Sequence, residues 1–280
     1  MLHQTTMATT ADRVGVLIVH GMGSQPRDFA DSFISELGSR LHALGVPAEA
    51  TVCQAAYWAD VLDRQESELW GRVALQPVSW RPLRRFVVSA VGDALAYRAS
   101  PTAVYTTYKR IHGRIADELA GLERAVGRDG APLVIIGHSL GSVIASDHVW
   151  DEQVGRGFGT SPFTRAETLA GMITFGSTLP LFGLDVDPIV PIRFPGAALT
   201  PQQKSNARWL NFYDAADVLG YPLKATAYGY EYTVDEDVVV DSGPPILDKT
   251  PLSHVYYWSN PDVINRTAIL IRELVTSRTT

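Results

Sequence analysis

Compact apolar runs recur along the chain, and stretches with helical spacing separate them. The runs lie at 14–19, 50–58, 132–136, 169–175 and 207–213. Short runs of this kind, rich in β-branched residues, are typical of strands that are buried in a parallel sheet. Because these strands alternate with helices, the pattern predicts an α/β fold with a mostly parallel central sheet and helices on both faces.

The stretches between the runs carry apolar stripes. After the first run, apolar residues recur at intervals of four, four, four and three, which places them on one face of a helix. The members of this stripe are Phe29, Phe33, Leu37, Leu41 and Leu44. Helices are also predicted over 101–126, over 142–150 and, near the C-terminus, over 264–275.

The C-terminal third contains a less regular segment. Residues 228–241 are expected to form one or two strands, and 238–240 is the strongest part of this prediction. The acidic cluster at 235–237 is interpreted as a solvated turn.

Two stretches depart from the alternation of strands and helices. Residues 60–100 are interpreted as short helices inserted between core elements, and 179–206 holds too many prolines for a regular element. No internal repeat or linker divides the chain. We therefore expect a loose N-terminal tail over 1–12 and a single domain over 13–280 that carries both insertions.

Composition restricts the class of protein. The chain has 280 residues, is 46% hydrophobic and has a formal net charge of −6, which suits one large α/β domain. It has no basic block, so we expect no nucleic-acid partner. Cys53 is the single cysteine, and the polar N-terminus lacks a signal peptide, which favours a cytoplasmic location. No apolar run approaches the ~20 residues of a membrane span. The sequence does not specify an oligomeric state.

Neither a metal nor a cofactor is expected. Zinc-binding motifs do not occur in the sequence. The glycine-rich turn at 20–24 lacks the lysine of a phosphate-binding loop, which argues against a nucleotide.

One pentapeptide carries the chemistry. Gly137-His138-Ser139-Leu140-Gly141 follows an apolar strand and precedes a helix. It resembles the G-x-S-x-G nucleophile elbow of the α/β-hydrolase superfamily. In such a turn the serine adopts a strained backbone conformation, and side chains at the two flanking positions would collide, which explains the glycines.

A serine nucleophile needs a base and an acid. In α/β-hydrolases both partners follow the serine, the acid first and the histidine last. Of the histidines, only His148 and His254 follow Ser139, and His148 lies more than two turns along the predicted helix, so the base is expected to be His254. Asp217 is the favoured acid and Asp214 the alternative, because both follow the strand at 207–213.

The oxyanion of an acyl-transfer intermediate needs two N–H donors. Leu140, directly after the nucleophile, is expected to supply one. The turn after the first strand is expected to supply the other, from Met22 or alternatively from Gly21 or Gly23. His20 in the same turn is interpreted as structural.

The resemblance to α/β-hydrolases extends over nearly the whole chain. The turn at 20–23, the elbow, the Asp217 loop and His254 carry it. The longer string GHSLGSVIASD looks like lipase- and esterase-type members and is similar to the elbow of intracellular DDHD-domain phospholipases. The resemblance implies a serine hydrolase that cleaves a carboxylic ester through an acyl-enzyme, without a cofactor.

The insertions are expected to select the substrate, because the core is generic. Leu181 and Phe182 could line an acyl pocket, which favours a small-molecule ester or a lipid-like substrate. The stretch 60–100 is interpreted as a helical cap; the alternative, an amphipathic lid, would allow peripheral contact with a membrane. A thioesterase, an acyltransferase or a phospholipase on the same triad stays open, as does a non-catalytic binding module that kept the fold.

Overall fold

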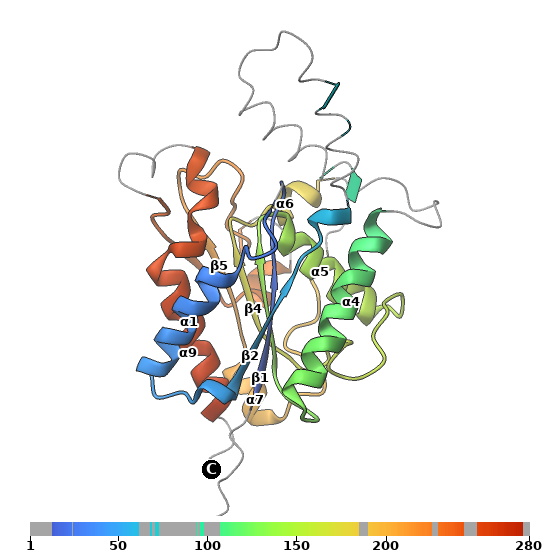
Figure 1. Cartoon of the computed structure of the whole chain (residues 1–280), viewed down its shortest axis with the longest axis vertical. Helices are drawn as coiled ribbons and strands as arrows, with labels where there is room; N and C mark the ends of the chain where they lie inside the picture. Colours follow the sequence, from blue (N-terminus) through green and yellow to red (C-terminus); the bar gives the residue numbers. More distant parts are fainter. Residues whose placement is uncertain are drawn as a thin grey trace, which may run out of the picture.

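The computed structural model describes residues 13–23, 25–61, 68, 71–72, 94, 96–97, 107–184, 190–225, 229–243 and 251–276. The expected tail at 1–12 lies outside these residues, as does the insertion at 60–100 except for positions 60–61, 68, 71–72, 94 and 96–97. Helices α1 and α9 cover one side of a central sheet, and α4 and α5 cover the other (Figure 1). The predicted α/β fold is confirmed.

In the described part of the chain, the sheet contains six parallel strands in the order β2-β1-β3-β4-β5-β6. The strands are β1 (Val14–Val19), β2 (Thr51–Ala56), β3 (Leu133–His138), β4 (Leu169–Phe175), β5 (Arg208–Tyr213) and β6 (Glu236–Val239). The first five coincide with the five apolar runs. All six strands point the same way, so the loops that leave their carboxyl ends gather along one edge of the sheet.

Among the residues that the structure describes, four long helices bury the two faces of the sheet. They are α1 (Asp31–Ala43), α4 (Thr107–Val126), α5 (Leu140–Gln153) and α9 (Pro261–Thr276). The predicted stripe of the first helix supplies the buried residues Phe33, Leu37 and Leu41 of α1. Short helices occupy connections: α6 (Leu179–Phe182), α7 (Pro201–Asn206), α8 (Tyr230–Thr233), η1 (Ala48–Ala50), η2 (Ala59–Val61), η3 (Pro251–Val255) and η4 (Tyr257–Ser259).

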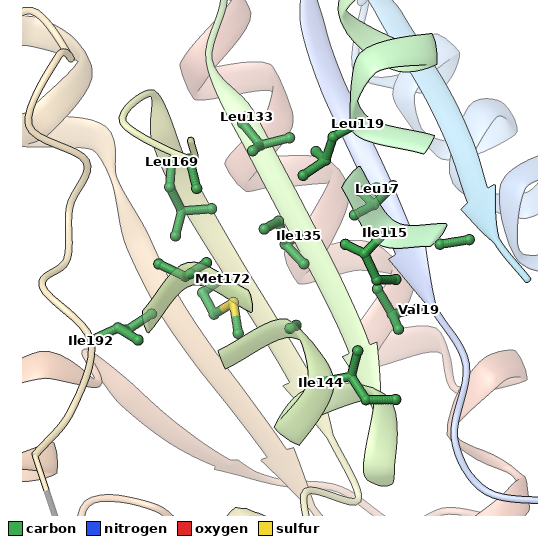
Figure 2. Packing of buried hydrophobic residues seen from close by; sticks show 14 of the residues in the cluster. Leu17, Val19, Ile115, Leu119, Leu133, Ile135, Ile144, Leu169, Met172 and Ile192 are labelled. Carbon is green, nitrogen blue, oxygen red and sulfur yellow. The ribbon is translucent and has the colours of Figure 1, made fainter. Parts of the chain in front are cut away.

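Successive strand residues enter two different cores because their side chains alternate between the faces of the sheet. In β1, Leu17 and Val19 pack on the α4–α5 side, whereas Val16 and Ile18 pack on the α1–α9 side. Figure 2 shows the first of these cores, where side chains of β1 and β3 meet those of α4 and α5. Strands buried on both faces explain why the sequence shows continuous apolar runs.

The proline-rich stretch 179–206 is more regular than its composition suggested. It contains α6 and α7, although positions 185–189 lie outside the described residues. Helix α7 begins with a capping box. The Thr200 hydroxyl oxygen accepts from the backbone N–H of Gln203, and the side-chain oxygen of Gln203 accepts from the backbone N–H of Thr200. Pro201 occupies a first-turn position that needs no N–H donor, so here a proline starts a helix.

The prediction for 228–241 is only partly right. Helix α8 occupies 230–233, where a strand was allowed, and β6 begins at Glu236. The interpretation of 235–237 as a solvated turn is wrong about the turn, because β6 begins at Glu236, although Asp235 and Glu236 are exposed. Asp235 accepts from the Trp209 backbone N–H, and the partly buried Asp237 accepts from the backbone N–H groups of Leu223 and Lys224. Asp235 and Asp237 therefore connect β6 to neighbouring backbone segments.

Within the described part of the chain, no helix combines the length and the apolar character needed to cross a bilayer. Among the same residues, no three His, Cys, Asp or Glu side chains gather in an arrangement that could hold a metal ion.

Candidate active site

Ser139 lies at the turn between β3 and α5, with φ 54° and ψ −125°. Few non-glycine residues adopt a positive φ, and such strain is held in place only by surrounding structure. Here the neighbours are glycines for a steric reason. A Cβ on Gly137 would lie 2.7 Å from the Ser142 Cα, and a Cβ on Gly141 would lie 2.4 Å from the Val19 carbonyl oxygen.

We expect Gly141→Ala to lower the free energy of unfolding by about 3 kcal/mol or more. The added methyl group would meet the carbonyl oxygens of Val19 and His20 at 2.4 and 2.5 Å, and these atoms belong to a central strand and its turn. Denaturant titration measures the effect. The control is Gly38→Ala in α1, where a Cβ meets no atom within 4 Å. Helix propensity favours alanine there by roughly 0.5–1 kcal/mol, so equal behaviour of the two variants would contradict the clash.

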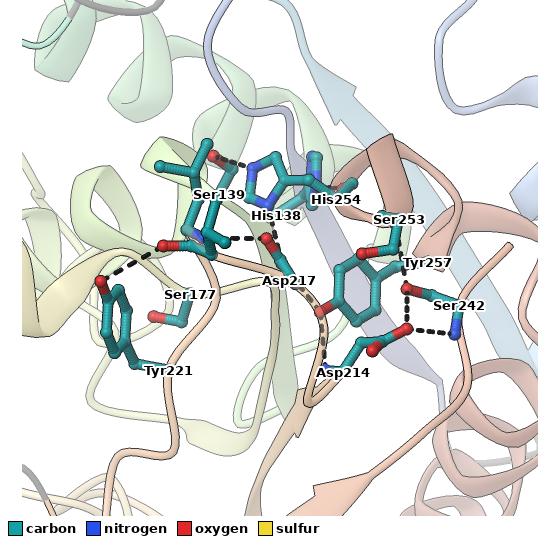
Figure 3. A network of polar contacts seen from close by, with 12 residues as sticks. His138, Ser139, Ser177, Asp214, Asp217, Tyr221, Ser242, Ser253, His254 and Tyr257 are labelled. Atoms are coloured by element: carbon teal, nitrogen blue, oxygen red, sulfur yellow. Dashed lines mark hydrogen bonds and ion pairs between the residues drawn. The ribbon is translucent and has the colours of Figure 1, made fainter. Parts of the chain in front are cut away.

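Three side chains from distant parts of the chain form one line of hydrogen bonds (Figure 3). His254 Nε2 lies 2.7 Å from Ser139 Oγ, and His254 Nδ1 lies 2.8 Å from Asp217 Oδ2. All three side chains are buried. An ionised carboxylate only accepts hydrogen bonds, so Nδ1 carries the proton and Nε2 is left to accept the serine hydroxyl.

The surroundings of Asp217 favour its ionised form. Burial alone would raise the pKa of this carboxyl group, but the hydrogen bond and charge of His254 oppose burial. Further hydrogen bonds from the Leu219 amide and the Tyr257 hydroxyl act in the same direction. The net result is a lowered pKa, so Asp217 remains a charged acceptor for the imidazole.

Asp214 does not contact His254 in this arrangement. Its Oδ2 accepts from both the amide and the hydroxyl of Ser242, and its Oδ1 accepts from the Ala216 amide. The Ser242 hydroxyl also lies 3.0 Å from the Ser253 carbonyl oxygen. Asp214 therefore ties the end of β5 to the loop after β6 and, through Ser242, to the segment that carries His254.

Two glycines leave room for the acid and the base. A Cβ on Gly220 would lie 2.4 Å from Asp217 Oδ2. Gly176, which ends β4 with φ +53°, would place a Cβ 3.2 Å from the His254 ring and 2.9 Å from the Tyr257 ring. Both positions keep the hydrogen-bonded side chains free of steric conflict.

The turn after β1 packs directly on the elbow. A Cβ on Gly21 would lie 2.7 Å from the Ser139 Cβ, so the Gly21 backbone lies against the nucleophile. Met22 is partly buried against the α4–α5 core, and Leu140 is fully buried at the start of α5. The two segments expected to supply oxyanion donors are thus adjacent.

His20 has a structural role in this turn. Its Nε2 accepts from the Trp58 amide, so Nδ1 carries the proton and donates to the Gly21 carbonyl oxygen. The ring stacks on the Trp58 indole with centroids 4.6 Å apart. Burial lowers the pKa of His20 to about 4. Both ring nitrogens are engaged, which leaves neither to act as a base.

Among the remaining sequence candidates, His148 packs between helices. Its ring stacks on His112 of α4 at 5.7 Å, and burial lowers its pKa to about 4. The proposed acyl-pocket residues both lie on α6. The Phe182 ring packs edge-on against Tyr97 at 6.2 Å, whereas Leu181 is exposed.

Two residues that contact the proposed acid or the backbone of the proposed base were not predicted from the sequence. His138 Nε2 donates to the His254 carbonyl oxygen at 2.8 Å, and burial, with the charge of His254 next, lowers the pKa of His138 to about 3. Tyr257 donates its hydroxyl proton to Asp217. The available signals were the polar residue inside the elbow and an aromatic residue three positions after the base.

Comparisons with known proteins add little to this geometry. No family model and no curated protein matches the chain. A structure of the metagenome-derived lipolytic enzymes LipS and LipT is similar over 94% of both chains, with 12% identity and a TM-score of 0.38. An oxidoreductase from Corynebacterium diphtheriae is similar over 96% of this chain and 100% of its own, with 14% identity and a TM-score of 0.29. Likenesses this weak carry no argument about function.

Proposed function

We propose that the protein is a serine hydrolase that cleaves carboxylic esters through an acyl-enzyme. One observation supports this most directly: a serine with positive φ shares its hydroxyl hydrogen bond with a histidine whose other nitrogen faces a buried carboxylate. A strained serine whose hydroxyl meets a free imidazole nitrogen is the arrangement that activates a serine. A purely structural serine does not need a strained backbone.

The proposed reaction uses the groups of the chain and water. His254 Nε2 takes the Ser139 proton as Oγ attacks the ester carbonyl carbon. Asp217 stabilises the imidazolium that forms and keeps the ring in place. The imidazolium then gives its proton to the leaving alcohol. His254 then takes a proton from water as the water oxygen attacks the acyl carbon, and it returns this proton to Ser139 Oγ as the bond to Ser139 breaks and the acid leaves.

Backbone amides of Met22 and Leu140 are proposed to hold the tetrahedral oxyanion. The approach of the Gly21 backbone to Ser139 supports this, because it brings the turn after β1 to the first turn of α5. A helix N-terminus also favours developing negative charge.

The proposed substrate has an apolar acyl or alcohol part. Exposed apolar side chains adjoin the acid and the base in sequence, namely Val218 after Asp217 and Val255 after His254. Leu181 of α6 is also exposed, whereas the next residue, Phe182, packs against the α4–α5 core. Apolar side chains next to the acid and the base in sequence favour a small ester or a lipid-like molecule over a charged one.

A fluorophosphonate probe tests the proposal, because it reacts only with an activated serine. We expect one equivalent of label, mapped by peptide mass spectrometry to Ser139. Ser142, which lies three residues away and donates to the Ser139 carbonyl oxygen, serves as the internal control and should remain unlabelled. An unlabelled Ser139 would contradict the proposal and favour the alternative of a non-catalytic binding module. A panel of esters and thioesters of increasing chain length then identifies the preferred bond.

A further inference from the structure

The Tyr257 hydroxyl has a fixed direction. It lies 2.8 Å from the Asp214 backbone nitrogen and 2.9 Å from Asp217 Oδ2. A backbone N–H can only donate, so the hydroxyl oxygen accepts from Asp214 and its single proton points to Asp217. Figure 3 shows Tyr257 between the two carboxylate-bearing residues.

The tyrosine is held firmly in this position. Its side chain is fully buried, and its ring stacks on Phe175 of β4 at 5.9 Å. Burial, and next the charge of Asp217, raises the pKa of Tyr257 well above its usual value, so the hydroxyl stays protonated and remains a donor.

One carboxylate oxygen of Asp217 therefore accepts two hydrogen bonds. Asp217 Oδ2 accepts from His254 Nδ1 at 2.8 Å and from Tyr257 at 2.9 Å. Two donors on one oxygen share its negative charge, so the hydrogen bond to either donor weakens the hydrogen bond to the other donor. Tyr257 thus reduces the charge that Asp217 offers to the imidazole.

We propose that Tyr257 is a positioning residue that fixes Asp217 and sets how strongly the carboxylate favours the imidazolium form of His254. The tyrosine touches no reacting atom and acts through Asp217. Its own anchor is the Asp214 amide at the end of β5. The catalytic meaning of this inference rests on the proposed hydrolase function, whereas the effect on His254 protonation does not.

Other titratable groups face His254 as well. In the described part of the chain they are Asp217 in the loop after β5, His138 on β3 and Tyr257 on η4. His138 stays neutral over the working pH range because its pKa is lowered to about 3. Tyr257→Phe keeps the ring that faces His254 and removes only the hydroxyl, whose proton points to Asp217, so a change in His254 protonation in that variant is transmitted by Asp217.

The test is Tyr257→Phe, which keeps the buried ring and removes the hydroxyl. Without the second donor, Asp217 Oδ2 holds the imidazolium more strongly, so the proton leaves at higher pH. We expect the midpoint of the His254 titration to rise by about 0.5–1 pH unit, the equivalent of one hydrogen bond. Histidine labelled with ¹³C at Cε1 reports this midpoint by NMR, and a His254→Asn spectrum assigns the signal.

The control is Tyr256→Phe, which removes the hydroxyl of the preceding, partly buried tyrosine. The midpoint should not move in that variant. A Tyr257→Phe midpoint equal to that of the wild type would overturn the proposal, even if its melting temperature falls, because a purely packing role changes stability alone. If Tyr257→Phe does not fold, 3-fluorotyrosine at position 257 replaces it. This stronger donor should move the midpoint to lower pH, and an unmoved midpoint would again overturn the proposal.

The NMR readout separates this inference from the proposed function. For an active enzyme, the acidic limb of kcat/KM against pH should move upward with the midpoint in Tyr257→Phe. If the midpoint moves but no ester or thioester is hydrolysed by the wild type, the role of Tyr257 stands and the hydrolase proposal fails.

Discussion

Ser139→Ala and His254→Ala are each expected to lower kcat/KM for an activated ester by about 10⁵- to 10⁶-fold. Either change removes the proton transfer that makes the serine a nucleophile. The two side chains share one hydrogen bond of 2.7 Å and act as a unit. The double variant should therefore be no slower than either single variant.

Steady-state hydrolysis of p-nitrophenyl esters measures these effects. Ser39→Ala and His42→Ala are the matched controls, because both side chains are exposed on α1 and remote in sequence from the elbow. They should retain full activity. Losses that multiply in the double variant would mean that the serine and the histidine act independently, which contradicts the proposed mechanism.

The fold could be predicted because its signals are local. Strands β1, β3 and β4 are buried on both faces and therefore appear as continuous apolar runs. The glycines of the elbow are required by contacts within the turn and with β1, as Gly137 and Gly141 show. Strand β6 was harder to delimit because it has only four residues and none of them is fully buried.

The site could be predicted only where chain order limits the choice. His254 was predicted from the order of the catalytic partners in the superfamily that the chain resembles. Tyr257 and His138 did not, because their hydrogen bonds join segments 40 and 116 residues apart. Asp237 shows the same limit, since two of its partners are backbone N–H groups that no side-chain pattern reveals, and the third, Asn211, lies on another strand.

Sequence left the choice between Asp217 and Asp214 open, and a pair of asparagine variants distinguishes their roles. We expect Asp217→Asn to lower kcat/KM by about 10⁴-fold. Asp217 receives donors on both oxygens, from Leu219 on Oδ1 and from His254 and Tyr257 on Oδ2. In either orientation of the substituted asparagine side chain, its NH₂ group faces one of these donors instead of accepting from it. The imidazole of His254 then loses the partner that fixes its tautomer.

Asp214→Asn should behave differently, because the Asp214 side chain holds Ser242 and Ala216 rather than the base. We expect Asp214→Asn to lower the free energy of unfolding by about 1–3 kcal/mol, since the NH₂ group of the asparagine would face the N–H or O–H donors of Ser242 or Ala216. The folded protein should keep kcat/KM within about 10-fold of the wild type. Denaturant titration and kinetics on the same samples separate the two effects. If Asp214→Asn instead abolished turnover while Asp217→Asn retained it, the hydrogen bond to His254 would not identify the acid, and the line of side chains in Figure 3 would be structural.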